Sequence, residues 1–368
     1  MRGIIRPQEP LFASFSVEER IPEGHPLRKL REVIDVGLKQ ISPVLTTMYA
    51  EVGRPSIPPE QLLRATIIQV LYSIRSERLL VEQLDYNFLF RWFVGLSIND
   101  RVWEHSTFSK NRDRLMESDI ATEFLSTLIK RARTEGMLSD EHFTVDGTLI
   151  EAWASQKSFQ RKDAQPPTQP PQGNTSRNAN VDFHGDERTN DTHASTTDPD
   201  ARLYRKSAGV GAKLVYMGHV LMDNLHGLVV STRFTHATGR AERAAAVAMM
   251  TDIKKDIPKK RFTLGCDKAY DVRAFRATMR REGVTLHAAQ NTRRPGGSSI
   301  DKRTTRHEEY EKSLRERKRV EEIFGWNKTV GPMRKIKLRG LERGGWLFTL
   351  SCAVLNAVRI RNHLCAAT

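Results

Sequence analysis

Two segments of this chain place an acidic residue directly after a short apolar run. Asp146 follows such a run in HFTVDGTLIEA, and Asp267 ends the run RFTLGCD. An aspartate before a glycine, as at Asp146, is also common in turns. The ends of neighbouring strands meet at one edge of a sheet, however, so acids far apart in sequence can face each other. We therefore predict that Asp146 and Asp267 are neighbours and bind a metal ion.

A third acid follows in RVEEIFGWNK, which has the apolar spacing of a helix. Val320, Ile323 and Phe324 form one stripe on a helical wheel, and this stripe should face the core. Each residue turns a helix by about 100°, so Glu321 lies on the flank of the stripe, whereas Glu322 lies about 150° from its centre. We predict that Glu321 is the third metal ligand and that its rival Glu322 points into solvent.

Three convergent carboxylates suit hard divalent cations such as Mg²⁺ or Mn²⁺. Two such ions about 4 Å apart activate the attacking oxygen and stabilise the leaving oxygen when a phosphodiester bond is cut. Asp271, shortly after Asp267, is a rival for the second position, although it is also placed to cap a helix. The chain has no Walker loop, GxGxxG segment or recognisable Ser/His/Asp set that would favour another chemistry.

The composition favours a polyanionic partner. The chain has 368 residues, 39% of them hydrophobic, and a formal net charge of +15. This length and composition are typical of a globular protein with two or more domains. A strongly basic balance favours nucleic acid first and a membrane surface second, and the remaining alternative is charge kept only for solubility.

The cysteines and the apolar stretches favour a cytoplasmic protein. Cys266, Cys352 and Cys365 are scattered and lack the spacing of a zinc site or a disulfide framework. The first residues lack the long apolar core of a signal peptide. Asn356 and two arginines interrupt the most apolar stretch, GWLFTLSCAVLNAVRIRNHL, which favours a buried terminal helix over a membrane span.

The patterning divides the chain into a helical region and an α/β region. Residues 1–138 have helical spacing, as in PPEQLLRATIIQVLYSIRSE and ATEFLSTLIKRARTEG, and are predicted to form an N-terminal helical domain. Residues 139–368 are predicted to form the catalytic domain. Within it, residues 156–206 are rich in Pro, Asn, Thr, Asp and Gly, so we predict a flexible insertion after the first core strand.

The catalytic domain alternates between strand-like and helical segments. After the insertion come the strand-like segments GAKLVYMGHVLMD and GLVVSTRFTHAT, joined by a hairpin connection. A helix, the strand ending on Asp267, a second helix, the short strand VTLHAA and a helical run with Glu321 follow. Three antiparallel strands followed by alternating helices and strands predict a mixed α/β sheet covered by helices.

In this order, the motifs resemble those of the bacterial insertion-sequence DDE transposases, IS-five-like group. HSTFSKNRDRL resembles part of the group's helical domain, VDGTLIEA its first-aspartate motif, and GCDKAYD its second-aspartate motif. NLHGLVVSTRFTHATGRAER resembles the strand and helix before the second aspartate. RKRVEEIFGWNK resembles the glutamate motif, commonly Tyr-x2-Arg-x3-Glu-x6-Lys. Arg317, Glu321 and Lys328 fit its spacing, whereas Leu314 stands at the tyrosine position.

The resemblance implies a ribonuclease-H-like catalytic core preceded by an all-helical domain that binds DNA or mediates assembly. It implies that Asp146, Asp267 and Glu321 are catalytic and hold two Mg²⁺ or Mn²⁺ ions. It implies a homodimer on double-stranded DNA that cleaves the terminal inverted repeats of its element and joins them to target DNA. The expected location is the bacterial cytoplasm, at the nucleoid.

Basic residues near the acids are predicted DNA contacts. Arg317 and Lys328 contact phosphates or hold Glu321 in place, unless they are ordinary charges on a helix flank. Arg293 and Arg294 lie in the basic segment NTRRPGGSSIDKRTTR, which either contacts the DNA backbone or is a solvated loop.

The segment ATGRAER contributes two further charged residues. Arg240 is a candidate for the edge of the active site and for DNA binding, with a plain helix-start charge as its alternative. Glu242 is interpreted as an acid of the first helical turn rather than as a ligand.

Two rival functions differ from transposition in what happens to the DNA. A related nuclease would cut nucleic acid without joining strands. A DNA-binding protein descended from a transposase would do neither, although the intact set of three acids argues against it.

Overall fold

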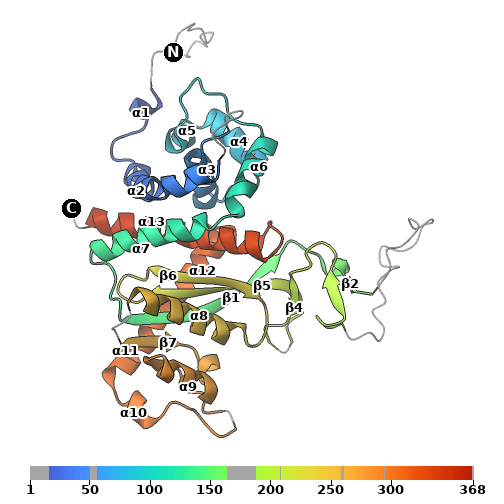
Figure 1. Cartoon of the computed structure of the whole chain (residues 1–368), viewed down its shortest axis with the longest axis vertical. Coiled ribbons are helices and arrows are strands. Elements are labelled where there is room, and N and C mark those ends of the chain that lie inside the picture. Colours follow the sequence, from blue (N-terminus) through green and yellow to red (C-terminus); the bar gives the residue numbers. More distant parts are fainter. Residues whose placement is uncertain are drawn as a thin grey trace, which may run out of the picture.

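The chain forms a helical region at one end and, next to it, a mixed sheet with helices on both faces (Figure 1). This arrangement confirms the predicted fold class. It is seen in a computed structural model, which describes residues 16–49, 56–163, 188–207, 209–257, 261–293 and 295–366. Arg294, one of the predicted DNA contacts, lies outside the described residues.

The helical region begins and ends its helices at residues suited to those positions. Its helices are α1 (Val17–Arg20), α2 (Pro26–Thr47), α3 (Pro59–Leu71), α4 (Glu77–Tyr86), α5 (Phe88–Val94), α6 (His105–Met116) and α7 (Ile120–Thr134). α2 and α3 have proline in the first turn, where a missing N–H leaves no hydrogen bond unmade. Asn87 caps α5 by accepting hydrogen bonds from two backbone amides, and Gly95 ends it with a φ of 90°.

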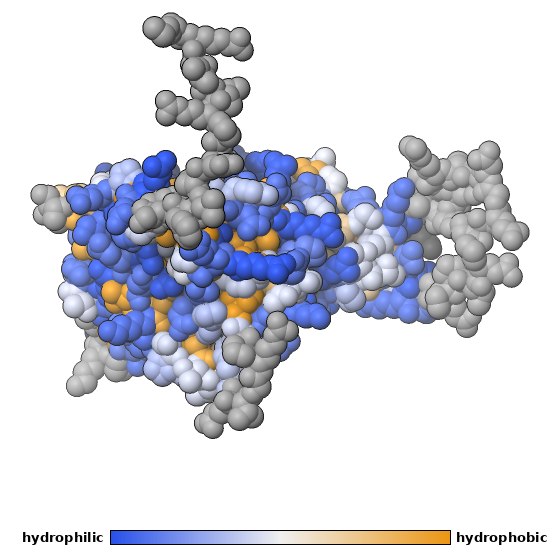
Figure 2. Space-filling model, turned by 90° about the horizontal axis from the view of Figure 1, so that it is seen from above, coloured by the Kyte–Doolittle hydropathy of each residue, from blue (hydrophilic) through white to orange (hydrophobic). Residues whose placement is uncertain are grey.

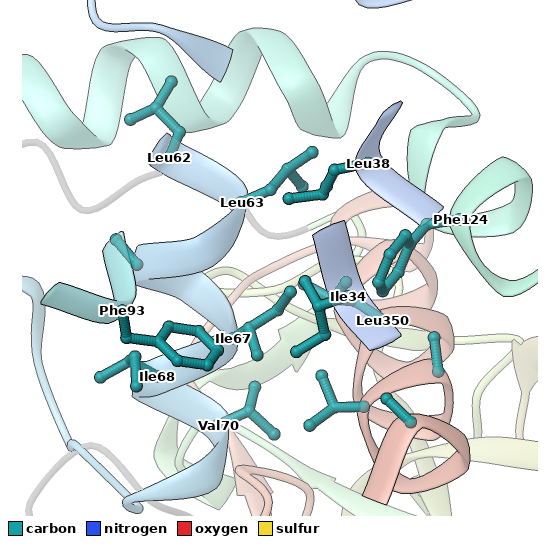
Figure 3. Close-up of a cluster of buried hydrophobic side chains, with 14 of the residues drawn as sticks. Ile34, Leu38, Leu62, Leu63, Ile67, Ile68, Val70, Phe93, Phe124 and Leu350 are labelled. Carbon is teal, nitrogen blue, oxygen red and sulfur yellow. The ribbon is translucent and has the colours of Figure 1, made fainter. Parts of the chain in front are cut away.

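One hydrophobic core joins the helical region to the last helix, α13 (Leu341–Ala366). Leu350 of α13 packs in the same cluster as Ile34 and Phe124 (Figure 3). Asn356 is buried inside α13, but its side chain hydrogen-bonds the backbone N and O atoms of Val229. The predicted buried terminal helix is therefore confirmed. None of the described helices is long and apolar enough to cross a membrane.

The outer surface of the helical region is mostly hydrophilic. Seen from above, blue residues predominate and the hydrophobic areas between them are small and separate (Figure 2). The apolar side chains of this region are therefore mostly buried in the core that it shares with α13.

The sheet has the main strand order β6-β5-β1-β7-β8, and β4 also pairs with β5 and β9 with β1. β1, β5 and β6 are antiparallel neighbours, whereas β7 and β8 run parallel to β1. This is the ribonuclease-H-like arrangement that the resemblance implies. The strands are β1 (His142–Ala152), β4 (Arg202–Tyr204), β5 (Lys213–Asp223), β6 (Val229–His236), β7 (Phe262–Cys266), β8 (Val284–Ala288) and β9 (Lys335–Ile336).

One edge of β1 is left unpaired over its middle. β7 pairs with β1 only at residues 142–144, and β9 pairs with it only at residues 151–152. No other described strand pairs with this edge in between. We call this stretch the notch of β1; it contains Asp146.

Alternate residues of β1 face opposite layers of the molecule. Phe143 and Val145 pack in the cluster that contains α8 (Ala241–Asp256) and α9 (Arg273–Arg281). Ile150 and Ala152 pack in the cluster that contains α12 (Val320–Thr329) and α13. By this alternation Asp146 belongs to the α12 face of β1 and Gly147 to the α8 face.

The predicted flexible insertion is wrong for its two flanks. β2 (Phe159–Arg161) follows the short helix η1 (Gln156–Ser158) and pairs with β3 (His193–Ser195). Asp198 is fully buried and accepts hydrogen bonds from the Tyr216 hydroxyl at 2.6 Å and from the Gly340 amide at 3.2 Å. These polar contacts compensate for the few apolar residues of the flanks. Residues 164–187 lie outside the described residues.

The predicted helical run with Glu321 consists of several pieces. α11 (Glu308–Glu316) leads into the 3-10 turn η3 (Arg317–Arg319) and then into α12. The basic segment before it also contains a short helix, α10 (Lys302–Thr305), that Asp301 caps by accepting a hydrogen bond from the Thr304 amide.

Candidate active site

Asp146 lies in the notch of β1, and its side chain is partly buried. Its Oδ1 accepts a hydrogen bond from the Gly147 amide at 2.8 Å. Burial raises the pKa of Asp146 to about 7; the negative charges of Asp267 and Glu242 add to this rise, and Arg317 opposes it. The carboxylate therefore has more negative than positive charge close to it.

Asp267 lies beside Asp146 because their strands are parallel neighbours. Thr144 of β1 pairs with Gly265 of β7, and each aspartate comes two residues after its member of that pair. Oδ1 of Asp267 accepts a hydrogen bond from the Ala269 amide at 2.7 Å, which caps the 3-10 turn η2 (Lys268–Tyr270). The two strand-end acids are thus brought together, as the sequence predicts.

Asp271, the rival of Asp267, has a different role. It is 1% exposed, and its carboxylate accepts hydrogen bonds from the backbone amides of Asn291 and Ser299, both at 2.8 Å. The Ser299 hydroxyl donates to it as well. Asp271 therefore holds the loop after β8 in place, which leaves the position at the notch to Asp267.

Glu321 and Glu322 are both exposed on α12. Val320, Ile323 and Phe324 are buried, so the predicted apolar stripe is confirmed. Glu322 Oε2 lies 3.2 Å from Arg359 Nη2 of α13, which occupies this carboxylate away from the notch. Glu321 forms no hydrogen bond or ion pair with another described residue, so its role as a ligand stays a prediction.

Of the two basic residues of the glutamate motif, Lys328 lies on the side of α12 that faces β1, and Arg317 precedes α12 in the turn η3. Lys328 Nζ donates a hydrogen bond to Thr148 Oγ1 at 2.6 Å, and Thr148 shares the face of Asp146. Burial lowers the pKa of Lys328. The charge of Arg317 lowers the pKa of Asp146. Leu314, at the tyrosine position of the motif, instead packs against the core below β7 and β8.

A basic pocket of about 440 Å³ opens next to Asp267. Arg243, Lys268 and Arg293 contribute its positive charge. Arg243 is held by hydrogen bonds to the carbonyls of Gly239 at 3.1 Å and Ala269 at 3.3 Å. Arg293 was predicted as a DNA contact, whereas Arg243 and Lys268 were not.

Arg240 is exposed and stands at the N-cap of α8 without a side-chain capping bond. It does not line the basic pocket. Its predicted role at the edge of the active site stays a prediction.

Glu242 is the acid that sequence reasoning assigned to the helix start alone. Burial raises its pKa, and the charge of Asp267 raises it further. It also contributes to the raised pKa of Asp146. The available sequence signal was its position in the first turn of the helix after β6, which points back toward the sheet.

The donor set at the notch suits a hard divalent cation. Asp146 and Asp267 offer carboxylate oxygens, the ligands such ions prefer, and burial raises the pKa of Asp146, to which the negative charges of Asp267 and Glu242 add. Among the described residues, however, no three acidic, histidine or cysteine side chains converge closely enough to hold a metal ion. The two aspartates therefore lie on neighbouring strands, and no third acidic side chain of the described residues joins them closely enough to hold a metal ion.

Two protein families match most of this chain. Residues 15–114 match the family described as Transposase domain (DUF772), and residues 186–356 match the family described as Transposase DDE domain. The second match includes Asp267 and Glu321 and begins after Asp146. No curated protein matches the chain.

Solved structures with some similarity are distant in sequence. The piggyBac transposase synaptic complex with hairpin DNA is 10% identical with a TM-score of 0.42, over 93% of this chain and 76% of that chain. The Mos1 transposase paired-end complex with left transposon end is 12% identical with a TM-score of 0.21, over 68% and 66%. The Mos1 mariner paired end complex with Mn is 14% identical, also with a TM-score of 0.21, over 65% and 61%.

Proposed function

Since this chain belongs to the insertion-sequence DDE transposases and is a DNA transposase, we propose that it cuts DNA at its element's ends and joins them to target DNA. Asp146, Asp267 and Glu321 carry the metal-dependent chemistry in this proposal. The observation that supports it most is the pairing of Thr144 with Gly265, which sets the two aspartates side by side in an unpaired part of the sheet edge.

Asp146 and Asp267 would hold Mg²⁺ or Mn²⁺ from two neighbouring strands, and Glu321 would complete the set from α12. Two ions, when bound, activate the attacking oxygen and stabilise the leaving one. The Lys328–Thr148 hydrogen bond fastens α12 to β1 and so positions the helix that carries Glu321. Arg317 offsets part of the negative charge around Asp146.

The reaction consists of two displacements at phosphorus. In the first, a water oxygen bonds to phosphorus at the element end, the P–O3′ bond breaks, and a 3′-hydroxyl is left. In the second, that hydroxyl oxygen bonds to a target phosphorus and the target's P–O3′ bond breaks, so the number of P–O bonds is conserved. The protein forms no covalent bond to DNA, and its residues act by positioning and charge.

The basic pocket beside Asp267 is suited to the phosphates that flank the reacting one. Arg243, Lys268 and Arg293 line it. Arg240 and Arg294 extend the proposed contact to double-stranded DNA, both terminal inverted repeats and target. The helical region binds the repeats or mediates assembly of a homodimer, and the protein acts in the bacterial cytoplasm at the nucleoid.

The test is cleavage and strand transfer by the purified chain with Mg²⁺ or Mn²⁺ and DNA carrying the repeats that flank its gene. Asp146→Asn should abolish cleavage while leaving binding to the repeats within about twofold, because it removes charge at the notch alone. Unchanged cleavage by this variant would remove Asp146 from the mechanism.

Pre-cut ends distinguish transposition from its two rivals. A transposase joins pre-cut 3′ ends to a target plasmid. Cleavage without joining would indicate a nuclease, and repeat binding without either reaction would indicate a DNA-binding descendant.

A further inference from the structure

Glu242 approaches the notch from the opposite side of the sheet to α12. It lies in the first turn of α8, and its side chain rests on Gly147, the residue after Asp146. A β-carbon added at Gly147 would lie 3.1 Å from Glu242 Cγ and 3.2 Å from Glu242 Oε1. The missing side chain at position 147 is therefore what lets this carboxylate come close to β1.

Glu242 has no ion-pair partner at this position in the described part of the chain, although the charge of the adjacent Arg243 opposes the rise in its pKa. It forms no ion pair or hydrogen bond with any other described residue, although it is partly buried. Its charged neighbour Arg243 donates its hydrogen bonds to the carbonyls of Gly239 and Ala269 instead. A partly buried carboxylate near two others is costly unless a positive charge joins them.

His219 provides a second, independent observation at the same place. It pairs with Gly147 across β5 and β1 and is 0% exposed. Its Nδ1 has no hydrogen-bond partner and lies 3.1 Å from the β-carbon position of Gly147. A buried polar atom without a partner therefore points to the same spot as Glu242 Oε1.

The tautomer of His219 follows from its hydrogen bonds. Its Nε2 lies 2.8 Å from Thr235 Oγ1, and the Thr235 hydroxyl donates to the His236 carbonyl at 3.1 Å. Since that hydroxyl proton is already used, Nε2 carries the imidazole proton and Nδ1 is left as an acceptor. Glu242 Oε1 and His219 Nδ1 are thus two acceptors at Gly147, on the α8 face of β1 and one residue after Asp146.

We propose that Glu242 and His219 form an outer layer of the cation site at the notch, with Glu242 as a fourth carboxylate. This inference rests on the proposed function, because it assumes that Asp146 and Asp267 hold a divalent cation. Mg²⁺ and Mn²⁺ keep several bound waters, whose hydrogens need acceptors. Glu242 and His219 Nδ1 supply such acceptors, and partners of this outer kind are known to tune metal affinity. Both are positioning residues rather than catalytic ones.

A purely structural role for Glu242 predicts a different outcome. An acid in the first helical turn stabilises the helix through its dipole, and its loss weakens folding whether or not metal is present. A role in the cation site predicts the reverse: removing a like charge leaves the metal-free fold at least as stable, while metal binding weakens.

The experiment measures Mn²⁺ binding to the full chain without DNA by isothermal titration calorimetry, and Tm in EDTA. Glu242→Gln should weaken Mn²⁺ binding by about 10- to 100-fold, as expected for an outer-layer partner, with Tm in EDTA equal to or above that of the wild type. Glu242→Asp should recover part of the affinity. Glu123→Gln is the matched control, because Glu123 is an exposed first-turn acid of α7, and it should leave Mn²⁺ affinity unchanged.

Asp146→Asn separates failure of this inference from failure of the proposed function. If Asp146→Asn loses Mn²⁺ binding and Glu242→Gln keeps wild-type affinity, the outer layer is refuted and the proposed function stands. If neither variant changes Mn²⁺ affinity, the notch is not the cation site and both proposals fail. A lower Tm in EDTA with unchanged affinity for Glu242→Gln would assign Glu242 to the helix start.

Discussion

Charged side chains are surrounded in opposite ways in the helical region and at the notch of β1. In the helical region, Arg91 is 3% exposed, and its guanidinium donates to the backbone carbonyls of Leu84, Ser97, Ile98 and Asp100. At the notch, Asp146 and Asp267 lie close to a third acid, Glu242, and within the described part of the chain Asp146 accepts a hydrogen bond only from the amide of the next residue.

We infer from this difference that the Arg91 site stabilises the fold and that the notch of β1 binds a cation. A buried charge with all its hydrogen bonds made holds three chain segments together and contributes to stability. Carboxylates that repel one another contribute nothing to stability, and their arrangement has a physical reason only if a cation joins them. Stability should therefore depend on the first arrangement, and activity and metal binding on the second.

The largest expected effect distinguishes the two glutamates of α12. Glu321→Gln should lower metal-dependent cleavage by about 1000-fold or more, equivalent to ~4 kcal/mol of transition-state stabilisation. Glu322→Gln is the matched control: it loses an exposed ion pair to Arg359 and should keep most of the activity. Single-turnover cleavage assays measure both. The opposite ranking would move the third ligand to Glu322.

The next effect concerns the helical region. Arg91→Met leaves buried carbonyl groups without donors and should lower the free energy of unfolding by about 3 kcal/mol. Urea unfolding followed by circular dichroism measures the change. Arg101→Met, at an exposed position in the same region, should stay within about 0.5 kcal/mol of the wild type. Equal effects at both positions would contradict the assigned role of Arg91.

A row of hydrogen-bonded side chains in the catalytic domain should contribute to folding stability, as Arg91 does, rather than to metal binding. His287 is 4% exposed, its Nδ1 lies 2.7 Å from Ser313 Oγ, and Ser313 Oγ lies 2.7 Å from His142 Nε2. Burial lowers the pKa of His287 to about 4, from an ordinary 6.5. Below pH 6.5 the unfolded state therefore binds a proton that the folded state does not, until pH 4 is reached.

The unfolding free energy should consequently fall as pH drops from 6.5 to 4, by about 2 kcal/mol for this group, and stay level with respect to it above pH 6.5. His287→Asn keeps a polar atom near the Nδ1 position but does not titrate, so its stability should depend less on pH. His307→Asn, at an exposed position, is the control. A slope unchanged by His287→Asn would show that another group titrates.

The smallest effects come from two glycines and sharpen the comparison. A β-carbon at Gly37 would lie 2.9 Å from both Phe124 Cε2 and Thr127 Oγ1 in the helical core. Gly37→Ala should therefore lower stability by about 1 kcal/mol, since crowding outweighs the gain in helix propensity. Gly147→Ala should leave stability nearly unchanged but displace Glu242 and weaken Mn²⁺ binding by about tenfold. Thermal unfolding measures the stability of both variants, and calorimetry measures their Mn²⁺ affinity. A loss of stability for Gly147→Ala together with weakened Mn²⁺ binding for Gly37→Ala would contradict the assignment of stability to the helical region and metal binding to the notch.

Periodicity and strand-end acids were sufficient to predict much of the molecule from its sequence. Short apolar runs predict β1 and β5, and the stripe of Val320, Ile323 and Phe324 predicts the buried face of α12. Asp146 and Asp267 were recognisable because each follows an apolar run, and parallel neighbours bring such positions together. These features depend on residues close in sequence, where spacing alone determines which side is buried.

Composition misled where polar contacts replace apolar burial. The flanks of the predicted insertion looked too polar to fold, yet Asp198 is buried because the Tyr216 hydroxyl and the Gly340 amide, both distant in sequence, donate to it. Asp271 was likewise only a rival of Asp267 in the sequence, and the tertiary structure gives it the hydrogen bonds to the loop after β8.

The sequence by itself therefore determined the order of elements, the pair of strand-end aspartates and the buried face of α12. Only the tertiary structure decided that α13 shares a core with the helical region and that Glu242 and His219 meet over Gly147. The physical reason is that a carboxylate in a helical turn and an imidazole on a strand carry no local sign of what lies opposite them. Their environment depends on how α8 crosses the sheet, and that is set by packing among segments far apart in the chain.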